Sequence, residues 1–135
     1  MVDPSVTAPI VRQLLILPLL VLGVSHIVQP AMWRTFFTRL HGEGPPGVVT
    51  RTFTLELWTA LVLFTFHQVW SGPEVLITIY GNLLVAKITL SMLWPAIGLR
   101  SLSMAESKGD MGFRVAGVVL CALATLCAAT TWGGL

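Results

Sequence analysis

Four apolar runs, each long enough to cross a lipid bilayer as a helix, account for most of this sequence. They cover residues 10–29, 48–69, 74–98 and 112–132. The hydrocarbon core of a bilayer requires about 20 predominantly apolar residues per helix. The chain has 135 residues, so four crossings leave room for little more than their connections. We therefore expect residues 1–135 to form a single membrane domain.

The amino-acid composition also indicates a membrane protein. Hydrophobic residues make up 55% of the chain and charged residues only 10%, whereas ordinary soluble domains are about 25% charged. The predicted fold class is an all-α integral membrane protein whose four transmembrane helices form a compact bundle. The net charge of +2 is small and no basic block alternates with aromatic residues, so we expect membrane lipids as partners and no nucleic acid.

The segment 31–41, which follows the first apolar run, has the pattern of a short helix lying in the membrane interface. Its apolar side chains recur at helical spacing while its basic side chains face elsewhere, which is typical of an interfacial amphipathic helix. The apolar set consists of Trp33, Phe36, Phe37 and Leu40. A second polar stretch follows the third run, at 100–110, and predicts another such helix.

Both halves of the chain share one layout: a crossing helix, the dipeptide Pro-Ala, a surface segment and a second crossing helix. The dipeptides begin at Pro30 and Pro95, 65 residues apart, but few other positions match at that offset. A parallel two-half repeat, with its axis along the membrane normal, is therefore one interpretation of the layout, and chance similarity is the other.

The connection between the second and third runs is very short, which predicts a tight antiparallel hairpin of two helices. Ser71 and Glu74 have the spacing of a capping box, in which both side chains would bind backbone amides at the helix start. Pro73 falls inside the first turn, where proline is tolerated.

The basic residues predict which connections face the cytoplasm, because cytoplasmic loops of membrane proteins carry an excess of Lys and Arg. Six basic residues lie in or beside the connections 30–47 and 99–111, whereas the other side has only Arg12. The six are Arg34, Arg39, Arg51, Arg100, Lys108 and Arg114. We therefore expect both connections in the cytoplasm, both termini outside, and location in the cell (inner) membrane.

Lys87 lies near the middle of the third apolar run and is the principal candidate for a functional residue. A charge at the bilayer centre costs roughly 3 kcal/mol on insertion scales, and such residues usually face the bundle interior and pair. At about 1.5 Å per residue, Lys87 and Glu56 lie roughly 16 and 12 Å from the cytoplasmic ends of their helices. We therefore predict an intramembrane ion pair between them, with His26, roughly 6 Å deep, as a neighbour.

Three interpretations of these charges stay open. The pair binds a solute, or it only fixes the register of the two helices, as buried ion pairs do in some proteins. In the third interpretation, Lys87 extends along its four-carbon stem to the interface and the two residues do not pair. A polar stripe at helical spacing around Lys87 favours a binding site, and it includes Tyr80, Ser91 and Trp94.

His67 is a second candidate, near the far end of the second apolar run. It shares a helix face with Glu56 but lies eleven residues away, about 16 Å along the helix. Because histidine titrates near neutral pH, His67 is predicted to be a gate or proton relay. The alternative is an interfacial histidine beside the aromatic anchor Trp70.

The remaining patterns argue against metal and cofactor chemistry and predict a helix contact. No His-x-x-x-His or Cys-x-x-Cys spacing supports a metal site, and we predict no cofactor. Small side chains on one face of the last helix allow close approach of another helix and predict a homo-oligomer contact. This face consists of Gly117, Cys121, Ala124 and Ala128.

Three functions agree with these patterns. The favoured one is a small transporter or channel subunit for an ion or small anionic solute, with Lys87 at the substrate and Glu56 as its counter-charge. The second is a non-catalytic accessory or assembly subunit that contacts a partner membrane protein. The third is an enzyme acting on a lipid or quinone, with Lys87, Glu56 and His26 as acid–base groups, and no motif supports it.

Overall fold

The computed structural model describes residues 2–133, and within this range the chain is helical and contains no strand. Four helical stretches are long and apolar enough to cross a membrane. The predicted helical class and the four candidate membrane helices are thus confirmed. The four stretches are α1 (Pro4–Val28), the continuous segment Pro45–Phe66, α5 (Val75–Leu93) and α7 (Gly109–Trp132).

Two short helices, α2 (Pro30–Gly42) and α6 (Pro95–Ser107), connect the long ones. Each begins with a proline, directly after a residue whose backbone leaves the helical region. Proline disfavours helical conformation in the residue before it, so one helix ends there and the next begins. The order long, short, long therefore occurs twice. An internal duplication and the location of α2 and α6 in the membrane interface stay predictions.

The third crossing helix is shorter than the predicted 74–98. Trp94 has φ −128° and ψ 88°, so α5 ends at Leu93 and the apolar residues after Pro95 belong to α6. The hydropathy pattern does not show this break, because the residues on both sides of the proline are apolar. Lys87 therefore lies six positions from its helix end, roughly 9 Å instead of 16 Å.

The other long helices begin earlier than predicted. Prolines explain two of the early starts, because the first helical turn tolerates a residue without an N–H group. The helices begin at Pro4 instead of 10, at Pro45 instead of 48, and at Gly109 instead of 112; the second crossing helix also ends at Phe66 instead of 69.

The second crossing helix changes its winding in the middle. Its parts α3 (Pro45–Arg51) and α4 (Leu57–Phe66) are joined by η1 (Thr52–Glu56), a turn of wider π-helix. Single π-turns inside α-helices are rare and are frequently found at functional sites. Here the wide turn ends with Glu56.

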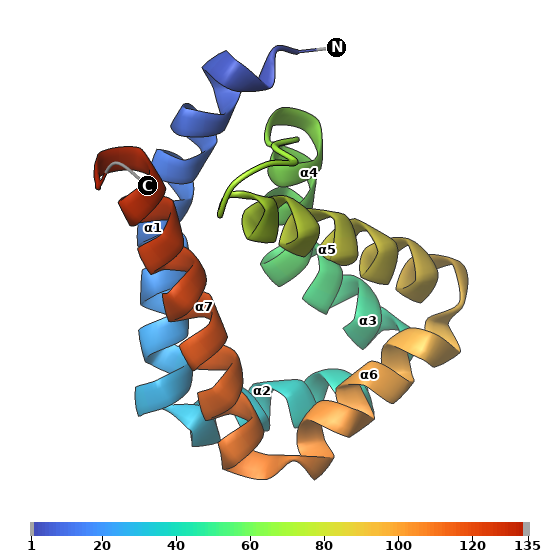
Figure 1. The fold of residues 1–135 in the computed structure, drawn as a ribbon. Coiled ribbons are helices and arrows are strands. Elements are labelled where there is room, and N and C mark those ends of the chain that lie inside the picture. Colours follow the sequence, from blue (N-terminus) through green and yellow to red (C-terminus); the bar gives the residue numbers. More distant parts are fainter. Residues whose placement is uncertain (1, 134–135) are drawn as a thin grey trace.

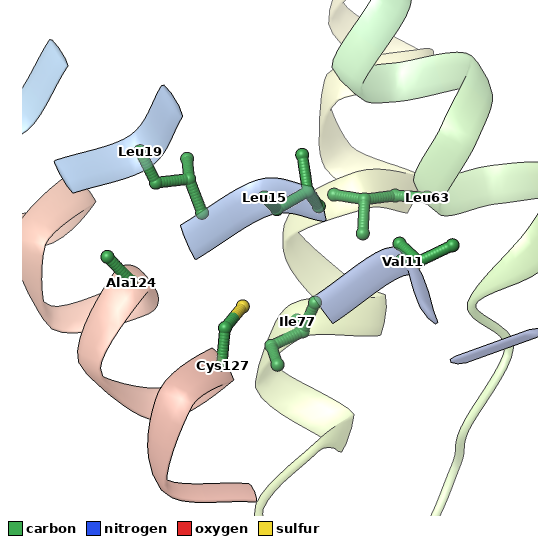
Figure 2. Packing of buried hydrophobic residues seen from close by; sticks show 7 residues of the cluster. All are labelled: Val11, Leu15, Leu19, Leu63, Ile77, Ala124 and Cys127. Atoms are coloured by element: carbon green, nitrogen blue, oxygen red, sulfur yellow. The ribbon is translucent and has the colours of Figure 1, made fainter. Parts of the chain in front are cut away.

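The long helices pack as two antiparallel pairs, α1 with α7 and α4 with α5 (Figure 1). A cluster of buried apolar side chains joins the pairs toward the end where α1 begins and α7 ends, termed here the termini end (Figure 2). At the opposite, short-helix end, α2 packs against α6. The apolar cluster consists of Val11, Leu15, Leu19, Leu63, Ile77, Ala124 and Cys127.

Small residues let α1 and α7 approach closely. A Cβ atom added at Gly117 would lie 2.5 Å from the Gly23 carbonyl oxygen, and one at Gly23 would lie 2.6 Å from the Cys121 Sγ atom. The face of α7 predicted as a homo-oligomer contact therefore packs against α1 of the same chain. The spacing correctly indicates a helix contact, but it does not say which helix is the partner.

Candidate functional site

Two cations share one carboxylate near the short-helix end. The Nζ atom of Lys87 contacts Oε1 of Glu56, and Nε of Arg51 lies 3.6 Å from the same oxygen. The three side chains come from α5, η1 and α3 and are termed here the charged triad. With all three groups ionised, the triad carries two positive charges and one negative charge.

Arg51 is the most buried member of the triad, with a side chain only 1% exposed. Its Nη1 donates to the Ser101 hydroxyl at 3.2 Å and its Nη2 to the Ser91 hydroxyl at 3.5 Å. With the predicted helix start at residue 48, Arg51 would lie at the helix end, so the sequence does not predict its place in the triad. Pro45 and Pro46 are the signal for the earlier start, which puts Arg51 nearly two turns inside the helix.

Three buried polar atoms around the triad have no hydrogen-bond partner within residues 2–133: Nε of Arg51, Oε2 of Glu56 and Oγ1 of Thr52. Buried polar groups in folded proteins are nearly always paired, and exceptions often have a functional explanation. Thr52 and Glu56 are the first and last residues of the π-turn. The wide turn thus places polar groups where the protein does not fully satisfy them.

Lys87 also lines a cleft of about 490 Å³ between the two helix pairs, termed here the cation cleft. Its wall contains residues of α1, α2, α5, α6 and α7. The other Lys and Arg residues in the wall are Arg100 and Lys108. Within residues 2–133 no carboxylate lines the cleft. The apolar part of the wall includes Phe37, Ile97, Met104 and Phe113.

Lys87 connects the buried triad with this cleft. Its side chain is 41% exposed, whereas the side chains of Glu56 and Arg51 are 10% and 1% exposed. An ammonium group that contacts a buried carboxylate and also reaches open space can exchange that partner for an anion without a change in the helix. The triad and the cleft together have the chemistry of an anion-binding site.

His26 belongs to the wall of the cation cleft. Its Nδ1 lies 2.7 Å from the Leu22 carbonyl oxygen, which can only accept, so Nδ1 carries a hydrogen. In the neutral ring, Nε2 is then an acceptor. The ring stacks on Trp33 with centroids 4.1 Å apart. His26 therefore contributes to the cleft, whereas its hydrogen bond goes to its own helix and not to the triad.

The other residues of the predicted polar stripe lie in different surroundings. Ser91 is buried and contacts Arg51. Tyr80 packs against the apolar cluster, and Trp94, at the break after α5, is 56% exposed. Helical spacing predicts one helix face for Lys87 and Ser91, but it does not show that α5 ends before Trp94.

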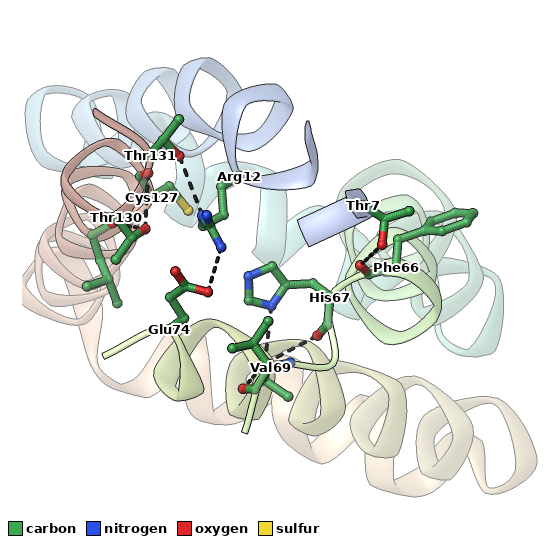
Figure 3. Close-up of polar contacts among 11 residues, drawn as sticks. Thr7, Arg12, Phe66, His67, Val69, Glu74, Cys127, Thr130 and Thr131 are labelled. Carbon is green, nitrogen blue, oxygen red and sulfur yellow. Dashed lines mark hydrogen bonds and ion pairs between the residues drawn. The ribbon is translucent and has the colours of Figure 1, made fainter. Parts of the chain in front are cut away.

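A second polar site lies at the termini end, where Arg12 and Glu74 form an ion pair (Figure 3). Nη1 of Arg12 lies 2.6 Å from Oε2 of Glu74, and the two side chains are 7% and 20% exposed. The predicted capping box is wrong, because α5 has no side-chain cap and the Glu74 carboxylate binds Arg12 instead. The Arg12 guanidinium carries a full positive charge, whereas a backbone amide does not, so Arg12 binds the carboxylate more strongly.

His67 is fully buried beside this pair, just after the end of α4 (Figure 3). Its Nδ1 lies 3.1 Å from Oγ1 of Thr78, which also lies 2.8 Å from the Val69 carbonyl oxygen and 3.2 Å from the His67 carbonyl oxygen. The Nε2 atom of His67 has no hydrogen-bond partner within residues 2–133. Burial, followed by the nearby Arg12 guanidinium, lowers the pKa of His67 from its ordinary value of 6.5.

The two polar sites are separated by apolar side chains. Between Glu56 and His67, the same buried face of the second crossing helix carries Ala60 and Leu63, which are 2% and 1% exposed. Two apolar side chains therefore lie between His67 and Glu56 on this face.

Metal ligation and known relatives add no assignment to these sites. Within the described range, no group of three or more His, Cys, Asp or Glu side chains could hold a metal ion. The chain matches no protein family, no curated protein and no solved structure. The function must therefore be argued from the geometry and charge of the two sites.

Proposed function

We propose that this chain is a small membrane transporter subunit that binds an anionic solute in the cation cleft, with Lys87 as the binding cation. The observation that carries the proposal is the ratio of two cations to one carboxylate in the charged triad. In this proposal the chain lies in the cell (inner) membrane, and the excess of basic residues in the connections favours the cytoplasmic side for the cleft.

The charge of the site favours an anion over a cation. Glu56 can balance only one of its two basic neighbours, and Arg100 and Lys108 add positive charge at the cleft wall. Clefts lined by one sign of charge raise the local concentration of counter-ions, and low-dielectric walls strengthen the effect. A bound anion would supply the negative charge that the site lacks.

Arg51 gives Glu56 a second partner while Lys87 binds solute. Removing one partner of a buried ion pair is costly because the other charge is left uncompensated. Since Arg51 lies 3.6 Å from the same carboxylate oxygen, Lys87 can turn to the solute without stranding Glu56. Glu56 therefore acts as the counter-charge of the empty site.

The arrangement of the helix pairs suggests how a solute would cross. The cation cleft lies between the pairs, and the apolar cluster joins the pairs toward the termini end. In this proposal the cluster is the barrier, and rocking of α1 and α7 against α4 and α5 opens the site to the other side. Motion of one bundle against another around a fixed site is the usual mechanism of secondary transporters.

Flux measurements in proteoliposomes test the proposal. A panel of labelled chloride, phosphate, acetate and octanoate is compared for wild type, Lys87→Gln and Arg39→Gln. Arg39 is a matched control because its side chain is 79% exposed, pairs with Glu43 on its own surface and does not line the cleft. We expect at least one anion to be transported, with flux reduced by about tenfold or more in Lys87→Gln and unchanged in Arg39→Gln.

Two results would contradict the transporter. One is wild-type flux in Lys87→Gln. The other is a folded, monodisperse protein that neither moves nor binds any anion of the panel, and co-purification of a stoichiometric membrane partner would then favour the assembly subunit.

A further inference from the structure

We infer that the solute is an amphiphile, with one anionic head and an apolar chain. The inference rests on the proposed anion site and specifies the class of its ligand. The observation behind it is the apolar part of the cation cleft, where apolar and aromatic side chains line the same space as Lys87.

The wall of the cleft has two chemistries. Lys87, Arg100 and Lys108 provide the cations, while Phe37, Phe113 and Met104 present apolar surface to the same space. A small hydrated anion gains nothing from the apolar wall, because it would lose water without a replacement partner. A ligand with a charged head and an apolar chain matches both parts.

The size of the cleft points in the same direction. A volume of about 490 Å³ falls in the range of pockets for organic molecules, about 300–1,000 Å³. One water molecule occupies about 30 Å³ in the liquid, so a halide or a phosphate ion would fill only a small part of the cleft. A carboxylate with a chain of several carbon atoms would fill much more of it.

Two apolar side chains of the cleft wall are exposed. α7 packs chiefly on α1 and α5 chiefly on α4, and the two pairs diverge toward the short-helix end (Figure 1). Ile97 and Met104, in the cleft wall, are 46% and 51% exposed. A ligand can therefore place its chain against these apolar side chains while its head reaches Lys87.

Binding of a homologous series tests the inference. The protein is placed in nanodiscs of zwitterionic phosphatidylcholine, and binding of acetate, butanoate, hexanoate, octanoate, phosphate and neutral octanol is measured against empty nanodiscs. We expect affinity to rise roughly fourfold for each methylene up to the length that the cleft buries. Phosphate, acetate and octanol should bind at least about tenfold more weakly than octanoate.

A pair of variants separates the apolar wall from the charge. Met104→Gln removes apolar wall and should weaken octanoate several-fold while leaving acetate unchanged. Met111→Gln is the matched control, because Met111 is 65% exposed and lies outside the cleft. Lys87→Gln should weaken every carboxylate.

The outcomes distinguish the two claims. If acetate or phosphate binds as tightly as octanoate, or octanol binds equally well, the amphiphile inference fails while the anion site can stand. If no anion of any length binds, the proposed function itself fails. Replacing part of the phosphatidylcholine by phosphatidylglycerol identifies the source of the ligand. Loss of octanoate binding assigns the site to an anionic lipid, whereas unchanged binding assigns it to a free amphiphilic anion. Both results support the inferred class of ligand.

Discussion

Glu56 and Lys87 contact each other, yet the surroundings of the two residues make their roles unequal. Glu56 compensates both Arg51 and Lys87 and is 10% exposed, whereas Lys87 reaches open space in the cleft. Without Glu56, the buried Arg51 guanidinium has no opposite charge beside it. Without Lys87, Glu56 still has Arg51 as its partner. At the residue scale, Glu56 is therefore expected to maintain the fold and Lys87 to bind solute.

Glu56→Gln should destabilise the protein far more than Lys87→Gln. Leaving a buried charge without its partner costs about 3–5 kcal/mol, whereas losing a partly exposed pair costs about 1 kcal/mol or less. Unfolding in mild detergent measures both variants, with Glu43→Gln as the control for a carboxylate in an exposed pair. Equal losses in Glu56→Gln and Lys87→Gln would show that the shared carboxylate has no special structural role.

His67 should make the termini end sensitive to acid. Its pKa in the folded protein is lowered by burial and by Arg12, so below about pH 6.5 the unfolded chain binds a proton that the folded chain resists. The contribution of His67 to the free energy of unfolding is therefore complete above that pH. It decreases as pH falls, by at most about 1.4 kcal/mol per pH unit.

His67→Asn keeps a polar side chain beside Thr78 but cannot titrate. Unfolding temperatures at pH 7.5 and 5.5 should therefore differ less in this variant than in wild type. The same pH dependence in both proteins would exclude His67 as the origin of the acid sensitivity.

At the element scale, prolines and small residues determine where the helices end and how closely they pack. Pro30 and Pro95 start new helices, and the small-residue face of α7 meets Gly23 of α1. The close approach of these two backbones fixes one of the two helix pairs between which the cation cleft forms.

Gly117→Ala should destabilise the contact between α1 and α7. The new Cβ atom would lie 2.5 Å from the Gly23 carbonyl oxygen, so the helices must separate. Overpacking of this kind typically costs about 1–3 kcal/mol. Gly42→Ala is the control, since no atom lies within 4 Å of its added Cβ. Unfolding in detergent measures both, and equal stability of the two variants would contradict the close contact.

The sequence predicts elements better than it predicts their ends and partners. Apolar length identifies the four crossing helices because membrane burial acts on whole segments. The break at Trp94 escapes a hydropathy pattern, although Pro95 marks it. The sequence pattern predicts only local roles for Arg51 and Glu74, a helix end and a cap, because a sequence shows local neighbours and not the residue on the facing helix.

At the scale of the whole molecule, two helix pairs hold polar sites at opposite ends with an apolar cluster between them. The charged triad opens into the cation cleft at the short-helix end, and the pair of Arg12 and Glu74 lies beside His67 at the termini end. The ion pair of Arg12 and Glu74 also joins the two helix pairs at the termini end, because Arg12 lies in α1 and Glu74 directly precedes α5. In the proposed transporter, solute would bind at the short-helix end and the termini end would close.

Chemical replacement of the Lys87 charge tests the central claim most directly. In a background with Cys121 and Cys127 replaced by alanine, Lys87→Cys is treated with a thiosulfonate that adds an ethylammonium group or with one that adds a neutral methyl group. Lys87 is suited to this because its side chain is 41% exposed. We predict that Lys87→Cys abolishes anion flux in proteoliposomes, and that the ammonium reagent restores it while the neutral reagent does not. Full flux in untreated Lys87→Cys, or equal recovery with both reagents, would contradict a role of the Lys87 charge in binding the solute.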